Sequence, residues 1–228
     1  MTRRGGPQRI PRPERHEPGG PAPWAHLDTP RVNVADVEHA LHRRGPGRHV
    51  GAQPHAQTRR TAVLVPLYDH GGETFVVLTR RAPPMRSHTH EVAFPGGRID
   101  PTDRDVWHTA LREADEEVAL DPRLPHRIGQ LDSFITGGSQ TLVTPLVAKL
   151  PARPELRAAE EEVEHILHVP LSELLLPEVF REEVWVREGR PWAISFFELV
   201  GDTVWGATGA MLRQLLAIAT GTDETLTR

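Results

Sequence analysis

The sequence predicts an α+β fold in which a mixed β-sheet lies between helices. Strand-like segments outnumber helical ones, and helices do not separate them at regular intervals, as they would in a doubly wound parallel sheet. A length of 228 residues suits one globular domain with extensions. Because 38% of the residues are hydrophobic and 25% are charged, the composition is that of a soluble protein.

The first 58 residues are predicted to form a largely disordered arm. Residues 1–29 are rich in Pro, Gly and Arg, and they offer too little apolar surface to offset the entropy of ordering. Val34, Val37 and Leu41 then recur at helical spacing after Asn33, a residue type that caps helices. The pattern predicts a short helix over residues 33–44, and we expect the folded domain to span residues 59–222.

The domain begins with a predicted β-hairpin. Two β-branched runs, TAVLVPLY and TFVVLTR, are separated by the turn-like DHGGE. A glycine-rich loop, FPGGRIDPTD, and a helix over about residues 105–118 follow, and then come the strand-like RIGQLDSF and TLVTPLVAKL. Further on lie EVEHILHV, a short helix near LSELLL, strand-like EEVWVRE and AISFFELV, and a final helix around ATGAMLRQLLAIAT.

The composition narrows the range of functions. The chain has no cysteine, which excludes disulfides, cysteine-ligated zinc and thiol nucleophiles, so a metal site must use carboxylate, carbonyl or imidazole ligands. A net charge of −4 gives no global attraction for nucleic acid or acidic membranes. Neither a membrane-spanning run nor the apolar core of a secretion signal is present, so we expect a cytoplasmic protein that acts on a small molecule.

The most informative segment is the acidic helix. Glu113, Glu116 and Glu117 stand at i, i+3 and i+4, so their carboxylates share one helical face, and we expect them to converge on one point. Such a cluster of like charges suits a hard divalent cation, Mg²⁺ or Mn²⁺. Arg112 directly precedes Glu113 and is expected to hold a carboxylate in a fixed orientation.

A pair of glycines precedes this helix. Gly96 and Gly97 let the backbone approach a ligand closely, so that a main-chain carbonyl is able to bind a metal. The acidic helix alone would fit an ordinary solvated surface. Its combination with the FPGG loop favours a metal site.

These two elements resemble the signature of the Nudix hydrolases, a glycine and a spaced acidic residue followed by R-E-hydrophobic-x-E-E-x-G-hydrophobic. The residues that fall on its second half are Arg112, Glu113, Ala114, Glu116, Glu117 and Leu120. Ala119 replaces the last glycine of the signature. Only Asp103 matches the spaced acidic residue, with one extra position before Arg112, so its role stays open.

The resemblance implies a Nudix-like α/β/α sandwich, Mg²⁺ or Mn²⁺ as cofactor, and hydrolysis of a phosphoanhydride bond. The metal ligands that it implies are Glu113, Glu116, Glu117 and the carbonyl of Gly97. Glu116 or Glu117 would double as the general base, with Arg112 as the residue that orients them.

A second resemblance concerns the substrate. The segment LTRRAPPMRSHTHEVAFPGG resembles a motif of the coenzyme A branch of that family, and the residues that match it are Leu78, Thr79, Arg81, Ala82, Arg86 and the FPGG tetrad. His90 departs from it, because the motif has glycine there. The resemblance implies cleavage of coenzyme A to adenosine 3′,5′-bisphosphate and 4′-phosphopantetheine. We expect Arg81, Arg86 and Gly96 to bind the substrate, since Arg forks pair with phosphates.

Other interpretations stay open. A Nudix enzyme could act on ADP-ribose, a nucleotide sugar or a dinucleotide, and a non-catalytic binding module of the same fold is a more distant alternative. Arg81 and Arg86 could also be ordinary surface arginines. The pair His88 and His90 suggests zinc only weakly, because no third ligand is evident. A homodimer is a further possibility.

Overall fold

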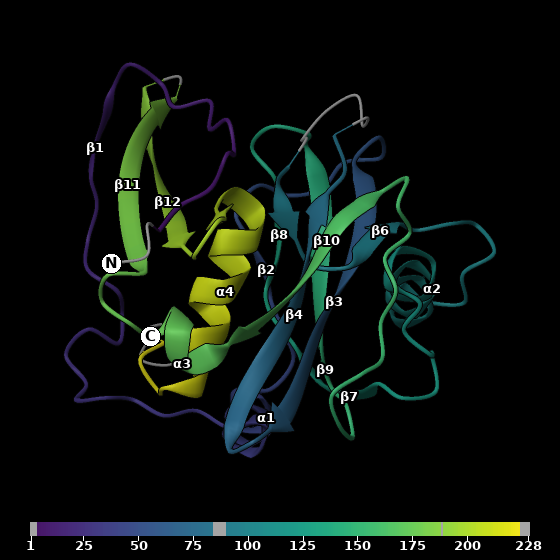
Figure 1. The fold of residues 1–228 in the computed structure, drawn as a ribbon. Helices are drawn as coiled ribbons and strands as arrows, with labels where there is room; N and C mark the ends of the chain where they lie inside the picture. Colours follow the sequence, from purple (N-terminus) through teal and green to yellow (C-terminus); the bar gives the residue numbers. More distant parts are fainter. Residues whose placement is uncertain (1–3, 84–89, 188, 224–228) are drawn as a thin grey trace.

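The computed structural model of the protein describes residues 4–83, 90–187 and 189–223 (Figure 1). The helices are α1 (Val34–Arg44), α2 (Val106–Val118), α3 (Leu171–Leu174) and α4 (Gly206–Ala219). The strands are β1 (His16–Pro18), β2 (His49–Val50), β3 (Arg59–His70), β4 (Glu73–Arg81), β5 (Val92–Ala93), β6 (Gly96–Arg98), β7 (His126–Gln130), β8 (Ser133–Ile135), β9 (Thr141–Lys149), β10 (Val163–Pro170), β11 (Phe180–Arg187), β12 (Arg190–Glu198) and β13 (Thr203–Val204).

The main sheet is mixed, as the sequence predicts. Its strands run in the order β10-β4-β3-β9-β8-β2, and β5, β6 and β7 pair with β4, β3 and β9 outside this path. The β3–β9 pair is parallel, whereas β3–β4 and β10–β4 are antiparallel. The predicted hairpin turns through Gly71 and Gly72, whose φ angles of 61° and 82° match the positive-φ turns that join antiparallel strands.

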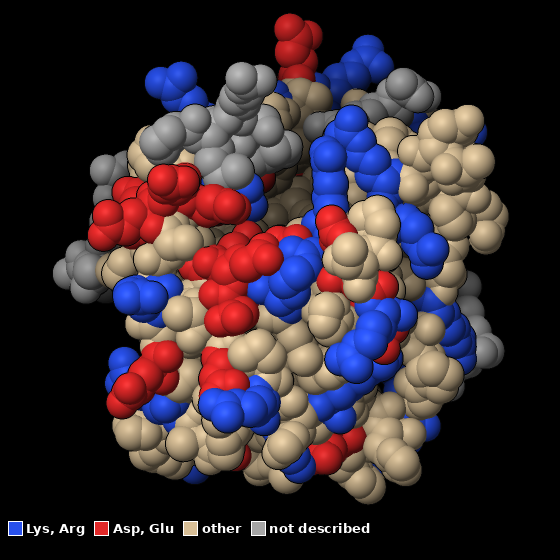
Figure 2. All heavy atoms as spheres, turned by 90° about the vertical axis from the view of Figure 1, so that its right-hand side faces the viewer, with Lys and Arg blue, Asp and Glu red and all other residues tan. Residues whose placement is uncertain are grey.

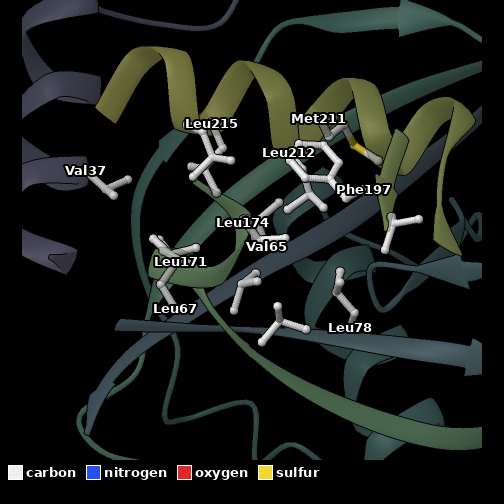
Figure 3. Close-up of a cluster of buried hydrophobic side chains, with 14 of the residues drawn as sticks. Val37, Val65, Leu67, Leu78, Leu171, Leu174, Phe197, Met211, Leu212 and Leu215 are labelled. Carbon is white, nitrogen blue, oxygen red and sulfur yellow. The ribbon is translucent and has the colours of Figure 1, made fainter. Parts of the chain in front are cut away.

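Helices cover both faces of this sheet, so the predicted sandwich is confirmed. Successive residues of β3 alternate between two apolar cores: Val65 and Leu67 belong to one, and Leu64 and Tyr68 to the other. The first core lies against α1, α3 and α4, and the second lies against α2 (Figure 1). In Figure 3, leucines of α3 and α4 meet side chains of β3 and β4 in the first core.

A second, smaller sheet lies beyond α4. Its strands run in the order β1-β11-β12-β13, so that α4 stands between the two sheets (Figure 1). Phe180 and Phe197 face each other across β11 and β12 with ring centroids 5.4 Å apart, and both belong to the core around α4. The sequence predicts these two strands but does not show that they form a separate sheet.

The arm differs from the largely disordered one expected for residues 1–58. Its first part lies on the second sheet, where β1 pairs with β11, whereas α1 and β2 belong to the main sheet and its first core. Trp24 is buried against Phe180, and its indole Nε1 donates a hydrogen bond to the carbonyl of Leu175. The Trp24 side chain thus adds a large buried apolar surface to a segment that is otherwise rich in Pro and Gly.

Ion pairs add further anchors along the arm. Arg4 pairs with Glu173 at 2.8 Å, and Arg12 donates from Nε and Nη2 to the carboxylate of Glu183. The helix expected next is α1, whose N-cap is Asn33. Asn33 and Asp36 form a capping box, each side chain accepting a hydrogen bond from the backbone N–H of the other. None of the helices in the described part of the chain is long and apolar enough to cross a membrane.

Candidate active site

Helix α2 carries the acidic residues singled out in the sequence. Asp105 caps its first turn by accepting a hydrogen bond from the backbone N–H of His108. Ala110, Ala114 and Val118 are buried on the sheet, in the core that also holds Leu64 of β3. Because this stripe fixes the rotation of the helix, the neighbouring acidic face lies along the edge of the sheet, next to β6.

Glu113 lies directly against the second glycine of the loop. A Cβ atom at Gly97 would stand 2.2 Å from Oε2 of Glu113, so no larger residue fits without displacing the carboxylate. The Glu113 side chain is only 17% exposed. Burial raises the pKa of its carboxyl, and the charges of Glu116 and Glu162 raise it further, while Arg112 acts in the opposite direction.

Glu117 lies beneath the first glycine. It is 5% exposed, and its Oε2 accepts a hydrogen bond of 3.3 Å from the backbone N–H of Gly96. Burial raises the pKa of Glu117 to about 8, and the charges of Glu113 and Glu162 contribute to the rise. The charge of Arg81 and the Gly96 hydrogen bond oppose this effect but do not cancel it. A charged Glu117 is therefore short of compensating positive charge.

Arg112 occupies the centre of an ion-pair network. Its Nε and Nη2 atoms donate to Asp103, each at 3.1 Å, and its Nη1 reaches Glu113 at 2.9 Å and Glu116 at 3.0 Å. It also donates to the carbonyl of Arg98, on β6. The expected orienting contact with a carboxylate is thus present, and it extends to two glutamates.

The sequence left the role of Asp103 open, and the structure places it as the anchor of Arg112. Its side chain is fully buried and accepts further hydrogen bonds from Thr109 Oγ1 at 2.8 Å and from the backbone N–H of Asp100 at 2.9 Å. The Arg112 guanidinium holds the pKa of Asp103 far below its ordinary value. The extra residue before Arg112 therefore does not prevent contact.

Glu116 does not point the same way as the other two glutamates, although the sequence predicts that all three carboxylates converge. It is 58% exposed and turned toward Arg112, whereas Glu113 and Glu117 face the glycine loop. The physical reason is that Glu116 pairs with Arg112 from the exposed side of the helix, whereas the side chain of Glu113, which the same guanidinium also contacts, is largely shielded from solvent. Within residues 4–83, 90–187 and 189–223, no three His, Asp or Glu side chains form a ready-made metal site.

Glu162 is a further acidic residue at the site that the sequence analysis missed. It lies in the turn before β10, and its charge raises the pKa of both Glu113 and Glu117. Its carbonyl accepts a hydrogen bond from the backbone N–H of Ala82, which ties this turn to the end of β4. The run of acidic residues at 160–162 is visible in the sequence, but no spacing connects it to α2.

The donor set fits a hard divalent cation. Glu117 is buried and Glu113 is half-buried, both carboxyls have raised pKa values, and Gly97 lies against Glu113. Mg²⁺ needs only one or two protein carboxylates, because it keeps several of its waters and takes up substrate phosphates. Figure 2 shows the α2 face, on which acidic side chains gather beside a hollow with basic side chains on either side.

The residues expected to bind substrate are only partly described. Arg81, at the end of β4, is half-buried and near enough to Glu117 to lower the pKa of its carboxyl. Gly96 lies over Glu117, as noted above. Arg86 and His88 fall outside the described residues. His90, which replaces a glycine, has a φ of 61°, a backbone conformation that favours glycine.

Comparison with known proteins finds one matching family and several relatives. The NUDIX domain family matches residues 58–189. A protein of Yersinia pestis (strain Pestoides F) named "Uncharacterized Nudix hydrolase NudL" is 37% identical over 160 residues, which cover 70% of this chain and 79% of that protein. A protein of the same name from Yersinia pseudotuberculosis serotype O:1b shows the same identity and coverage.

Solved structures of lower identity were also found. A MutT/nudix family protein from Enterococcus faecalis aligns over 85% of this chain and 70% of its own, with 14% identity and a TM-score of 0.48. The NUDIX domain of Shewanella oneidensis NrtR, solved as a complex with ADP ribose, aligns over 55% and 82%, with 19% identity and a TM-score of 0.43.

Acidic side chains on a helix beside a glycine loop are suited to a hydrolase that uses divalent cations. The chain belongs to the Nudix family. It is accordingly a pyrophosphatase of nucleoside diphosphate derivatives.

Proposed function

We propose that this enzyme hydrolyses the diphosphate of coenzyme A to adenosine 3′,5′-bisphosphate and 4′-phosphopantetheine. The observation that carries the proposal is the position of Arg81. This residue belongs to the segment that resembles the coenzyme A motif, and it lies within electrostatic reach of Glu117. A substrate phosphate bound by Arg81 would therefore be close to the carboxylates of α2.

The proposed metal ligands are Glu113, Glu116, Glu117 and the carbonyl of Gly97. Bound Mg²⁺ or Mn²⁺ would lower the pKa of a water and neutralise charge on the phosphoryl oxygens. Glu113 and Glu117 already lie against the glycine loop. Glu116 is held nearby by Arg112, from which it would have to turn to join them.

The chain's own residues then serve to orient groups and to move a proton. Hydrolysis forms a bond between a water oxygen and one phosphorus, breaks the bridging P–O bond, and releases a proton from the water. Glu116 or Glu117 would accept that proton as the general base, as the resemblance to the family implies. Arg112, anchored by Asp103, keeps Glu113 and Glu116 in place.

Substrate recognition is assigned to Arg81, Arg86 and Gly96. Adenosine 3′-phosphate 5′-diphosphate is densely anionic, and the planar guanidinium of Arg binds phosphate through two parallel hydrogen bonds. Gly96 presents a backbone N–H at the site, which donates to Glu117. Glycine at this position is required by the close packing on β3, where a Cβ would stand 2.5 Å from the carbonyl of Ala62, and the role of Gly96 next to the substrate rests on the resemblance.

The side chain of His90 favours a second class of substrate as the alternative. His90 replaces the glycine of the coenzyme A motif, and its imidazole Nδ1 lies 2.9 Å from Oε2 of Glu164. A side chain at this point could change the substrate preference to ADP-ribose, a nucleotide sugar or a dinucleotide.

The test is to incubate the purified full-length chain with coenzyme A and with ADP-ribose in parallel, with Mg²⁺ or Mn²⁺, and to identify the products by mass spectrometry. We expect adenosine 3′,5′-bisphosphate and 4′-phosphopantetheine, and a higher kcat/KM for coenzyme A than for ADP-ribose. Faster cleavage of ADP-ribose would reject coenzyme A as the substrate. Nucleotide binding without any product would instead favour the non-catalytic binding module.

A further inference from the structure

Polar side chains from separate segments meet at the end of β4, away from the α2 carboxylates. We call them the Gln8 cluster, which consists of Gln8, Arg80, His90, Glu164 and Asp202. Gln8 belongs to the arm and is buried. Its Nε2 donates to Asp202 Oδ1 at 2.8 Å and to the carbonyl of His90 at 2.9 Å, and its Oε1 accepts from the backbone N–H of Thr203. The amide is therefore fully used in hydrogen bonds to other segments.

The charged members complete the cluster. Arg80 Nη1 lies 3.2 Å from both oxygens of Asp202, and Arg80 Nε donates to Glu164 at 3.2 Å. Glu164 also pairs with the imidazole of His90 at 2.9 Å. The arm is thereby connected to β4, to the segment before β5, to β10 and to the segment before β13.

His90 is the member whose backbone most needs support. Its φ of 61° is costly for a residue with a Cβ atom, and such conformations persist where surrounding contacts fix them. The N–H, the carbonyl and the imidazole of His90 are each engaged, by the carbonyl of Arg81, by Gln8 and by Glu164 respectively. Removing Gln8 would free the carbonyl, which is one of these three restraints.

Two backbone hydrogen bonds connect Arg81 to the segment that contains His90. Its carbonyl accepts from the N–H of His90 at 3.1 Å, and its own N–H donates to the carbonyl of Glu91 at 3.0 Å. Arg80 and Arg81 are consecutive in a strand, so their side chains leave the backbone in opposite directions. Arg80 enters the Gln8 cluster, whereas the charge of Arg81 acts on Glu117.

We propose that Gln8 is a positioning residue for substrate binding, which fixes the backbone beside Arg81 and so keeps that guanidinium next to the α2 carboxylates. The inference rests on the proposed role of Arg81 as a phosphate-binding residue. The hydrogen bonds of Gln8 go to His90, Asp202 and Thr203, so its loss acts on binding affinity and not on the bond-cleaving step. The arm thereby contributes to the substrate site of the domain.

The experiment compares the full-length wild type with Gln8→Ala and with the control Arg12→Ala. Arg12 also belongs to the arm, but it holds the second sheet through Glu183. The probe is ADP with Mg²⁺, whose dissociation constant is measured by calorimetry, together with hydrogen exchange of the backbone over residues 79–83 and 90–93. Activity assays on the best substrate of the panel give KM and kcat.

For Gln8→Ala we expect a rise of about 5-fold or more in the Kd for ADP and in KM, with kcat within about twofold of wild type. Exchange should become faster over residues 90–93 and stay unchanged in α2. Arg12→Ala should lower Tm without changing Kd. If Gln8→Ala does not fold, Gln8→Met, which keeps the length of the side chain but loses its donor and acceptor, should show the same rise in Kd.

An unchanged Kd in the Gln8 variants, or an equal rise in Arg12→Ala, would overturn the proposal. So would a wild type that does not bind ADP, because the premise about Arg81 would then fail. The Kd for ADP can be interpreted whichever substrate the enzyme prefers, because ADP lacks the pantetheine part that distinguishes coenzyme A. Preference for ADP-ribose over coenzyme A would reject the proposed function and leave the role of Gln8 standing.

Discussion

Arg112 and Asp103 form a two-point ion pair, in which Nε donates to Oδ1 and Nη2 to Oδ2, both at 3.1 Å. The pair is held inside the protein, because the Asp103 side chain is fully buried. Arg112 uses its remaining nitrogen, Nη1, to contact Glu113 and Glu116. The positions of these two glutamates therefore depend on a carboxylate that touches neither of them.

The first prediction concerns this dependence. Asp103→Asn keeps the size of the side chain but removes the charge that fixes Arg112, so we expect kcat to fall roughly 10- to 100-fold. Asp105→Asn is the matched control, because Asn caps helices as well as Asp does and this variant should stay near wild type. Steady-state kinetics on both variants decide the question, and equal activity of the two would remove Asp103 from the site.

The second prediction concerns stability and pH in protein stripped of metal by a chelator. The pKa of Glu117 is raised in the folded state from about 4.5 to about 8, so between these values the folded state binds more protons than the unfolded state. The contribution of Glu117 to stability is thus fully present below about pH 4.5 and is lost as the pH rises through about 8.

Glu117→Gln removes this titration. Relative to wild type, the variant should gain in Tm as the pH is raised from 5 to 8, when melting is followed by circular dichroism in the presence of chelator. Saturating Mn²⁺ should stabilise wild type more than the variant. A difference in Tm that stays constant over this range would show that Glu117 is not buried as described.

The third prediction tests the close contact of Gly97 with Glu113. In Gly97→Ala the new Cβ would stand 2.2 Å from the carboxylate, so Glu113 must move, and we expect a loss of at least ~10-fold in Mn²⁺ affinity. In Gly138→Ala the new Cβ meets nothing within 4 Å, which makes this variant the control. Calorimetric titration of both measures the effect, and similar affinities would mean that Glu113 is not a ligand.

The fourth prediction concerns the end of α2. Ala119 terminates the helix with a φ of 54° and donates its N–H to the carbonyls of Ala114 and Asp115, which is the geometry that favours glycine. Ala119→Gly should therefore stabilise the protein by ~0.5–1 kcal/mol with unchanged kcat. Urea unfolding provides the measurement, and a lower free energy of unfolding would count against the strained cap.

Local patterns were sufficient to predict the elements that carry the site. The glutamates at helical spacing predict α2, and the β-branched runs around Gly71 and Gly72 predict the hairpin of β3 and β4. The contact of Arg112 with Glu116 follows from the i,i+4 helical spacing, whereas its contact with Glu113 joins consecutive residues. Each of these inferences uses residues that are close together in the chain.

The features that sequence reasoning missed depend on contacts between distant segments. The alternation in β11 and β12 shows that they are strands but not which sheet they join. Glu162 comes near α2 because the segment before β10 contacts the end of that helix, where the N–H of Ala159 donates to the carbonyl of Glu117. Trp24 is buried against Phe180 of the second sheet. Helical spacing also does not show that Glu116 stays 58% exposed while Glu117 is buried.

The central claim is that Glu113 and Glu117 together bind a divalent cation beneath Gly96 and Gly97. Its most direct test is Mn²⁺ binding, followed by electron paramagnetic resonance, in the wild type and in the double variant Glu113→Gln, Glu117→Gln. The account predicts saturable binding by the wild type and a loss of at least ~100-fold in affinity in a folded double variant. Equal Mn²⁺ affinity in the two proteins would contradict it.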